Sequence, residues 1–572
     1  MEKIKKLKRL LNKNNLDGYY VPKNDEFFCE YISANKDRLK FISNFSGSYG
    51  FAIILKDKNY LFVDGRYTLQ ANIESKKFFK VITLPNKLPL DILKKKKLKI
   101  GYDPRLHTKK NLNTVFNKTR CKLIPTKSNL IDKLWFRNEK TKSKEYYLLP
   151  KKAVGQPHKF KIKKLISSLN SKGVNFQLIT SSENIAWLLN IRGNDSEFTP
   201  LPNALLTVDT YDKINLFCDL KKINQSLITK FKNIKILDIK QIEFYLSKVR
   251  NKKILLDADS CSLHFDSILN KNNKIIYSSD PINFLKSIKS KIEINNIIKC
   301  HIYDGAALTK FLFWLKKNYK VKNITEIKAQ ETLLKFRKKN KSFKSLSFPT
   351  ISGSGPNGSI IHYKASKKSN RKLKNGDIYL VDSGGQYNYG TTDVTRTISL
   401  DNNKSRIKDI FTRVLKGHIA VANYNLKNNT FGAQIDLVAR KPLKEINLDY
   451  AHGTGHGVGY FLNVHEGPQA ISKFNKIVLK EGMVISNEPG YYENGKFGIR
   501  IENLLRIKKV NKKISFENLT IVPIDKTLIN KNILSKKEID WLNNYHRDVF
   551  HKLKKYMNRS ELISLKTACS KI

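Results

Sequence analysis

Three histidines and five glycines crowd into the stretch AHGTGHGVGYFLNVHEGP, residues 451–468. The chain has only 11 histidines among its 572 residues, so this segment is strongly enriched in them. Glycine loses the most conformational freedom on folding, and its density here argues against a regular helix. His456 therefore does not fit the HExxH type of zinc site, which needs histidines at i and i+4 on one helical face. The glycines would instead let the backbone pass close to a site and turn the imidazoles towards it.

Two aspartates flank a turn in DIYLVDSGGQYNYGTTDVTRTISL, residues 377–400. The segment is typical of two strands, and a hairpin centred between Tyr387 and Asn388 places Asp382 directly opposite Asp393. Side chains so opposed have Cβ atoms roughly 5 Å apart, and two like charges at that distance repel. Such a pair needs a shared proton or a cation. The alternative is a pair of ordinary aspartates beside a turn.

Two more carboxylates stand beside apolar strands. MVISNEPGYY, residues 483–492, is an apolar strand that ends at Glu488, and glutamate is seldom buried without a partner. In GIRIEN, residues 498–503, the two-residue period of a strand places Arg500 and Glu502 on one face. An ordinary surface ion pair is the alternative interpretation of this second motif.

A cluster of these carboxylates would need compensating charge. Asp382, Asp393, Glu488 and Glu502 would together carry four negative charges, which two divalent cations would neutralise. His456 would add one nitrogen ligand. An oxygen-rich ligand set with a single imidazole suits manganese or similar ions better than metals that prefer thiolate. Two such ions about 3.5–4 Å apart can hold a hydroxide between them and polarise a carbonyl group.

The elements that must position these residues change in character along the chain. Up to about residue 150, and again up to about residue 260, short apolar strands alternate with helices, which predicts two α/β sheets. The segment FAIILKDKNYLFVDGRY predicts a hairpin that turns at 56–59. In the C-terminal part, the patterns predict helices at 293–317, 324–339 and 403–425. They predict strands within 348–400 and at 483–488 and 498–507.

Five motifs in this order resemble the pita-bread metallopeptidases of family M24. They are VDSG, GTTDVTRT, HGTGHGVG, NEPGYY and GIRIEN. The match is closer still to the aminopeptidase P group, which FPTISGSGPNGSIIHY and FLNVHEGP also resemble. GYYVPKNDEFFCEYI, FVDGRY, ENIAWLLNIRG and IDWLNNYH are similar to its three-domain cytosolic form, so the resemblance covers nearly the whole chain.

The resemblance implies an α/β (α+β) fold with three domains. Two creatinase-like N-terminal α/β domains, at 1–152 and 153–292, would precede a C-terminal pita-bread catalytic domain at 293–572. The implied activity is metal-dependent release of the N-terminal residue from peptides with proline in second position, by a metal-bridging hydroxide that attacks the scissile carbonyl. The implied cofactors are two divalent metal ions, expected to be Mn²⁺. A homodimer, with the N-terminal domain in the interface, is also implied.

Site residues follow from the same resemblance, position by position. The implied metal ligands are Asp382, Asp393, His456, Glu488 and Glu502. Glu488 would also exchange the proton of the bridging water. His452 and His465 would serve the scissile carbonyl and the tetrahedral intermediate, and His362 would line the substrate side. Arg500 would orient the groups around the ligands through Asp382 or the Glu502 region. The segment KASKKSN after His362 lacks the proline expected from animal members, which implies a changed loop near the substrate entrance.

Composition limits the other classes of function. The net charge of +59 would suit a nucleic-acid partner, but the lysines are spread from end to end, which indicates a solvated surface and no specific nucleic-acid partner. None of the six cysteines forms a CxxC pair, which indicates a reducing compartment and hence the cytoplasm. No apolar stretch approaches the length of a membrane span.

Two alternatives to an aminopeptidase stay open on the sequence. Prolidase uses the same ligand set on Xaa-Pro dipeptides but generally lacks the middle domain. A non-catalytic pita-bread binding module would have lost metal ligands, whereas all five positions match here.

Overall fold

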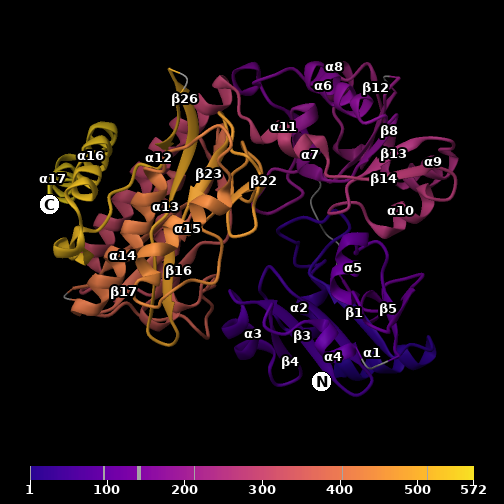
Figure 1. Cartoon of the computed structure of the whole chain (residues 1–572), viewed down its shortest axis with the longest axis horizontal. Helices are drawn as coiled ribbons and strands as arrows, with labels where there is room; N and C mark the ends of the chain where they lie inside the picture. Colours follow the sequence, from indigo (N-terminus) through magenta and orange to yellow (C-terminus); the bar gives the residue numbers. More distant parts are fainter. Residues whose placement is uncertain (1, 95–96, 138–143, 212, 402, 512) are drawn as a thin grey trace. The chain divides into compact units, whose positions relative to one another are not determined.

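The computed structural model describes residues 2–94, 97–137, 144–211, 213–401, 403–511 and 513–572 (Figure 1). The chain forms two compact units. The first unit comprises Met1–Pro150 and Gln156–Asn283, and the second comprises Lys151–Gly155 and Phe284–Ile572. The domain boundaries expected at 152/153 and 292/293 stay predictions.

The first unit contains two six-stranded sheets with the same topology. The first sheet has the order β4-β3-β2-β1-β5-β6, formed by β1 Gly18–Pro22, β2 Phe51–Leu55, β3 Asn59–Asp64, β4 Lys80–Leu84, β5 Lys99–Tyr102 and β6 Lys122–Pro125. The second has the order β12-β11-β10-β8-β13-β14, formed by β8 Phe176–Ile179, β10 Leu205–Asp209, β11 Ile214–Cys218, β12 Ile234–Asp238, β13 Lys253–Leu256 and β14 Lys274–Tyr277. In each sheet three central strands pair antiparallel and the outer ones pair parallel. The prediction of an α/β sheet twice over is confirmed, although the second sheet continues past residue 260.

Apolar runs explain the strands and helices of this unit. FAIIL of β2 is buried at every position, and the chain turns at 56–58 into β3, as the hairpin prediction requires. The first helix, α1 Glu2–Lys13, buries Ile4, Leu7 and Leu11 on one face. The other helices of this unit are α2 Arg38–Ser43, α3 Thr68–Ser75, α4 Pro89–Leu93, α5 Lys109–Phe116, α6 His158–Ser171, α7 Ser182–Leu189, α8 Gln225–Lys230, α9 Ile242–Lys248 and α10 Leu263–Leu269.

The long helices of the second unit pack in three apolar clusters. The short α11 Pro281–Ser287 leads into α12 Lys291–Asn318, and α12 with α13 Glu326–Lys338 shares one apolar cluster with β17 Ile378–Ser383 and β20 Val394–Ser399. The helix α15 Gly432–Lys444 shares another cluster with β23 Val484–Asn487 and β26 Asn503–Val510. Helix α14 Ser405–Ala422 and the C-terminal α16 Lys536–Leu553 and α17 Arg559–Ala568 pack in a third. The predicted helices α12, α13 and α14 are confirmed, whereas α15 was not predicted.

Several small antiparallel sheets complete the second unit. Their orders are β16-β17-β20, β22-β21-β23-β26-β27, β15-β18-β19 and β24-β25. The strands not yet bounded are β15 Phe343–Leu346, β16 Ile351–Ser354, β18 Gly385–Tyr387, β19 Gly390–Thr391, β21 Gly455–Gly457, β22 Glu466–Ile471, β24 Gly490–Glu493, β25 Phe497–Arg500 and β27 Lys513–Asn518.

The register between β17 and β20 corrects one expectation. Asp382 pairs with Thr395, not with Asp393, because the hairpin turns at 388–389, one residue later than expected. A shift of one residue in the turn centre moves the facing partner by two. Asp393 directly precedes β20, so the pairing places Thr395, not Asp393, opposite Asp382.

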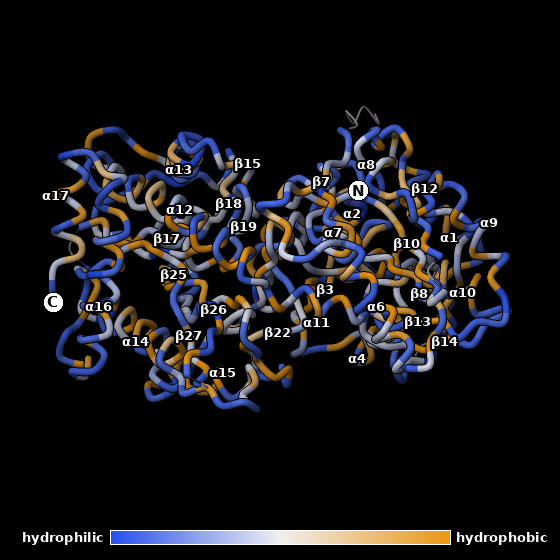
Figure 2. The backbone as a smooth tube through the Cα atoms, turned by 90° about the horizontal axis from the view of Figure 1, so that it is seen from above, coloured by the Kyte–Doolittle hydropathy of each residue, from blue (hydrophilic) through white to orange (hydrophobic). Residues whose placement is uncertain are grey.

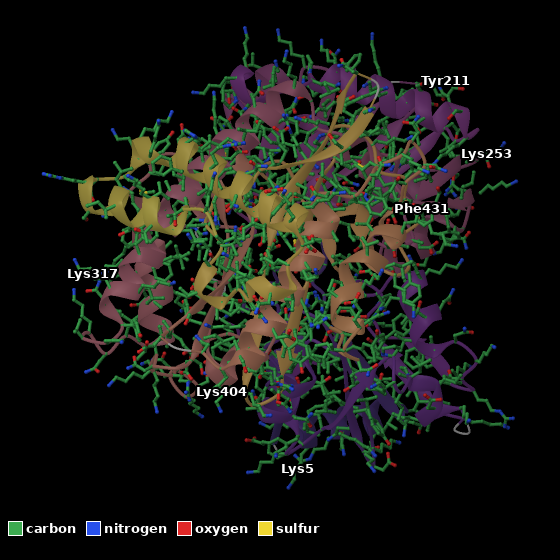
Figure 3. The ribbon with its side chains drawn as sticks, turned by 60° about the vertical axis from the view of Figure 1, so that its left-hand side comes forward. Lys5, Tyr211, Lys253, Lys317, Lys404 and Phe431 are labelled. Carbon is green, nitrogen blue, oxygen red and sulfur yellow. The ribbon has the colours of Figure 1, made fainter. Side chains whose placement is uncertain are left out.

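Hydropathy and charge are distributed as in an ordinary folded chain. Figure 2 shows hydrophobic runs along interior strands such as β8 and β17, with hydrophilic stretches along the connections. In Figure 3, Lys5 and Lys253 of the first unit, and Lys317 and Lys404 of the second, extend into solvent from separate places. Among the described residues, no helix is both long and apolar enough to cross a membrane.

Candidate metal centre

The five expected ligands come from five different chain segments of the second unit. Asp382 is on β17, Asp393 directly precedes β20 and His456 is the middle residue of β21. Glu488 directly follows β23, and Glu502 directly precedes β26. Both aspartates and Glu502 are buried. Strand ends therefore supply most of the site, which lets side chains from several sheets point into one space.

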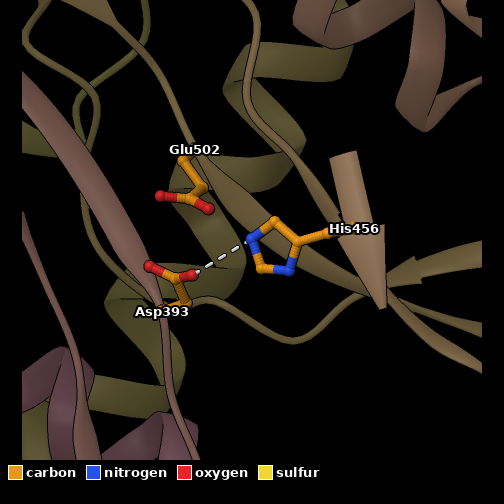
Figure 4. A group of neighbouring side chains, drawn as sticks. All are labelled: Asp393, His456 and Glu502. Carbon is orange, nitrogen blue, oxygen red and sulfur yellow. Dashed lines mark ion pairs between the residues drawn. The ribbon is translucent and has the colours of Figure 1, made fainter. Parts of the chain in front are cut away.

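Three of the five converge closely. Ligand atoms of Asp393, His456 and Glu502 all lie within 4.8 Å of one another (Figure 4). His456 Nε2 is 3.4 Å from Asp393 Oδ2 and also 3.4 Å from Glu488 Oε1. Asp382 joins the group through its charge, which raises the pKa of Glu502. Sequence spacing alone could not have shown this convergence.

The position of His456 depends on a close approach of two strands. A Cβ atom at Gly455 would lie 1.9 Å from the carbonyl oxygen of Ser486, so only glycine lets β21 lie this close to β23. His456 Nδ1 lies 2.9 Å from the carbonyl oxygen of Gly457, so in a neutral ring it carries the proton and donates it there. Nε2 is then left with its lone pair facing the carboxylates, as a metal ligand requires.

Hydroxyl groups orient the glutamates. The Ser486 hydroxyl donates to Glu488 Oε1 at 3.0 Å and accepts from the backbone N–H of His456 at 2.9 Å. The Thr395 hydroxyl donates to Glu502 Oε2 at 2.8 Å and accepts from Arg500 Nε at 3.0 Å. Because Arg500 and Glu502 both reach Thr395, they do share a side, as predicted. The segment that carries them is not one strand, however, since the chain leaves β25 at Arg500 and enters β26 after Glu502.

Buried oxygen atoms without partners indicate room for cations. Asp382 Oδ1 and Asp393 Oδ1 are buried and have no hydrogen-bond partner among the described residues. An unpaired buried carboxylate oxygen is costly unless it binds a cation or a proton. Four carboxylates and one imidazole, with two oxygens unpaired, fit an oxygen-rich site for divalent ions.

The pKa values show the same crowding of negative charge. Burial raises the pKa of Asp382 to about 7, even though Arg500 lies beside it. Burial, then the charge of Asp393, raises the pKa of Glu502 well above its ordinary value. For His456, burial would lower the pKa, but the neighbouring carboxylates outweigh it and raise that pKa to about 9. Without cations the site therefore holds protons.

A pH dependence of stability follows from these shifts. The folded metal-free protein binds protons at Asp382 and His456 more tightly than the unfolded chain does, so this contribution is complete at low pH. It is lost as the pH rises through about 7 for Asp382 and about 9 for His456. Cations replace those protons, so the gap in melting temperature between Mn²⁺-loaded and metal-free protein should widen from pH 5.5 to 7.5. Calorimetry at both pH values checks this, and a constant or narrowing gap would contradict it.

Arg500 and His452 are linked through Tyr492, which sequence patterns alone do not mark as a site residue. Arg500 Nη2 donates to Asp382 Oδ2 at 2.6 Å, and Nη1 donates to the Tyr492 hydroxyl at 2.5 Å. That hydroxyl lies 2.9 Å from His452 Nε2. Arg500 thus contacts Asp382 directly, and its orienting role stays a prediction. Tyr492 is the last residue of the motif NEPGYY, and its place four residues after Glu488 is the sequence signal that could have indicated it as a site residue.

The other two histidines are placed differently. The ring centroids of His465 and His456 are 4.3 Å apart, so His465 lies beside a proposed ligand. His465 is exposed, so it can meet a molecule that arrives from solvent. His362 is half-buried just after the 3₁₀ turn Gly355–Ser359, which packs against β25 at Gly498. Its substrate role stays a prediction.

Helix α15 holds the His452 segment from behind. Arg440 Nη2 donates to the carbonyl oxygen of His452 at 2.6 Å, and its Nε donates to Asp436 Oδ2 at 2.8 Å. Asp436 Oδ1 accepts from the Thr454 hydroxyl at 2.6 Å, and the carbonyl oxygen of Thr454 accepts from the N–H of Glu488. The helical spacing of apolar residues in GAQIDLVARKPLK could have revealed this helix, although Pro442 interrupts the pattern.

Known protein families match nearly all of the chain. Metallopeptidase family M24 matches residues 295–509, and the C-terminal region of peptidase M24 matches 512–572. The creatinase/prolidase N-terminal domain matches twice, over 3–134 and 137–293.

Individual relatives match across the same length. A probable Xaa-Pro aminopeptidase P of Laccaria bicolor is 38% identical, covering 96% of this chain and 90% of the relative. Xaa-Pro aminopeptidase 1 of Dictyostelium discoideum is 37% identical, covering 96% and 93%. The crystal structure of X-prolyl aminopeptidase from Caenorhabditis elegans, described as a cytosolic enzyme with a di-nuclear active site, matches with a TM-score of 0.94 at 30% identity, covering 100% of this chain and 99% of that one.

These matches confirm the resemblance and the fold class drawn from the sequence motifs. The group of Asp393, His456 and Glu502 brings together residues from three of the motifs that carry the resemblance. The chain belongs to metallopeptidase family M24, with two creatinase/prolidase-type N-terminal domains before the catalytic one.

Proposed function

We propose that this metallopeptidase is an aminopeptidase that releases the N-terminal residue from peptides with proline in second position. One observation carries the proposal: carboxylates gather around His456 in a chain whose relatives over almost its full length bear the name Xaa-Pro aminopeptidase. The proposed ligands are Asp382, Asp393, His456, Glu488 and Glu502.

The proposed cofactors are two divalent cations, and Mn²⁺ is the ion we expect. The donor set is four carboxylates and one imidazole, without a thiolate, which favours such ions. The di-nuclear site named for the nematode structure supports the number. When bound, the two ions compensate the buried negative charge, polarise the scissile carbonyl and make water acidic enough to supply a nucleophile at neutral pH.

The side chains around the cluster would handle protons and orientation. Glu488, oriented by Ser486, would accept the proton of the attacking water and pass it to the leaving proline nitrogen. His465 would meet the scissile carbonyl from the exposed side. His452, whose Nδ1 lies 2.8 Å from the Gly453 carbonyl oxygen and whose Nε2 lies 2.9 Å from the Tyr492 hydroxyl, would lie beside the tetrahedral intermediate.

Selection for proline has a physical reason. An Xaa-Pro bond is a tertiary amide without an N–H, so enzymes that rely on that donor disfavour it. A site that makes no use of the donor and offers room for the ring selects proline instead. The positively charged α-amino group of the substrate would lie near the carboxylates, which places the cut after the first residue.

The substrate prediction is tested by product analysis. We expect release of the first residue from Arg-Pro-Pro peptides, complete loss of cleavage after N-acetylation, and strong loss when alanine replaces the proline. Xaa-Pro-Yaa tripeptides should be cut faster than Xaa-Pro dipeptides. Equal or faster dipeptide cleavage would make the protein a prolidase, and indifference to proline would exclude both activities.

The remaining proposals concern assembly and place of action. We propose that the protein forms a homodimer, as the resemblance implies. We also propose that it acts in the cytoplasm, which the description of the nematode enzyme as cytosolic supports. The non-catalytic alternative predicts tight, sequence-insensitive binding to nucleic acid at physiological salt without peptidase activity. The scattered lysines in Figure 3 favour weak polyanion contacts that salt removes.

A further inference from the structure

A buried histidine on α14 clamps the strand end from which Glu488 projects. His418 and Asn487 are both fully buried. His418 Nδ1 lies 3.1 Å from the carbonyl oxygen of Asn487, and Asn487 Nδ2 donates back to the carbonyl oxygen of His418 at 2.9 Å. Asn487 is the last residue of β23 and immediately precedes Glu488. The two hydrogen bonds therefore act on the backbone of that strand end, one residue before a proposed ligand.

The protonation state of the ring decides the direction of this contact. Burial lowers the pKa of His418 to about 3, against the opposing effects of the Asn487 and Ile501 carbonyls. The ring is thus neutral in the physiological range and has one proton to donate. A carbonyl oxygen can only accept, so that proton lies on Nδ1.

Helix packing sets how far His418 can reach. A Cβ atom at Gly417 would lie 2.2 Å from the carbonyl oxygen of Ala439 on α15. Any side chain at 417 would push α14 away from α15 and move the ring of His418 with it. The clamp therefore depends on the packing of the two helices that line this half of the unit.

We propose that His418 is a positioning residue of the metal centre, which it serves by holding Asn487 and so the backbone that presents Glu488. The inference rests on the metal centre proposed above. His418 itself is not a proposed ligand; it fixes the position of the backbone from which the Glu488 side chain projects. Groups that orient ligands in this way typically change metal affinity about 10–100-fold when removed.

A second buried histidine supplies a matched control. His546 on α16 is also fully buried, and burial lowers its pKa to about 3 as well. Its Nε2 accepts from the N–H of Ile524 at 3.1 Å, and Ile524 neighbours none of the proposed ligands in the chain. Replacing His418 or His546 by leucine thus removes comparable buried rings, but only one of them touches the strand end at Glu488.

The experiment compares Mn²⁺ binding by full-length, metal-free variants, measured in competition with a chelator of known affinity. His418→Leu should bind Mn²⁺ about 10–100-fold more weakly than the parent. His418→Asn, whose amide can replace Nδ1 as donor, should recover most of that loss. His546→Leu should lower the melting temperature of the metal-free protein but leave Mn²⁺ affinity unchanged.

Several outcomes would overturn the inference. Unchanged Mn²⁺ affinity in His418→Leu would do so, and so would equal losses in both leucine variants, because these would reflect general loosening. If His418→Leu does not fold, Asn487→Ala removes the reciprocal donor and must weaken Mn²⁺ binding by itself; unchanged binding there also overturns it. A parent chain that binds no Mn²⁺ would overturn the metal centre together with this inference, which separates the two failures.

Discussion

Replacing Glu488 by glutamine is expected to remove nearly all turnover of Xaa-Pro peptides. Glutamine keeps the size and the oxygen that accepts from Ser486, but it has no charge and cannot accept a proton. General acid–base catalysis contributes about 10²–10⁴-fold to a rate, and the loss of a charged metal ligand adds to that. Steady-state kinetics with an Arg-Pro-Pro peptide, at saturating Mn²⁺, measures the effect.

Stability distinguishes a chemical role of Glu488 from a structural one. Burial raises the pKa of Glu488, so its ionised form is disfavoured in the folded metal-free protein. The neutral glutamine removes that penalty, and metal-free Glu488→Gln should melt no lower than the metal-free parent at pH 7.5. Activity within a few-fold of the parent would mean that Glu488 is merely the end of a strand.

Removing the metal ions is expected to abolish activity and lower the melting temperature together. The carboxylates repel one another without cations, and two buried oxygens, Asp382 Oδ1 and Asp393 Oδ1, then lack partners. Ions that bind only the folded state stabilise it by about 2.7 kcal/mol per site at a free concentration 100-fold above Kd. Dialysis against a chelator followed by calorimetry measures this loss, and added Mn²⁺ should restore both properties.

Two neighbouring histidines provide the controls for metal removal. His456→Ala takes away a proposed ligand, so it should lose bound metal as well as activity. His465→Ala leaves all five proposed ligands intact, so it should keep its metal and lose rate, although the two rings are only 4.3 Å apart. Full activity in a demonstrably metal-free sample would refute the metal centre, and equal metal loss in both variants would refute the separate roles.

Much of the fold could be predicted because its signals are local. The strand FAIIL is a continuous apolar run, and the helix α12 has apolar residues at helical intervals. The burial of these residues confirms both predictions. The helix α15 was missed because Pro442 lies within it, and proline normally ends a helix. Tertiary packing against β23 and β26 keeps that helix intact.

By itself, the sequence determined the composition of the proposed metal centre. Four carboxylates and one imidazole in recognisable motifs specify the donor atoms, and these are chemical properties of the residues. The tertiary structure decided which of them meet and what holds them. The register at Asp382 depended on the hairpin turn, where a one-residue shift changes the facing partner by two. The contacts of Arg500 with Tyr492, and of His418 with Asn487, join residues 8 and 69 positions apart. The longer of these contacts exists only because α14, α15 and β23 pack together, and no local pattern encodes that packing.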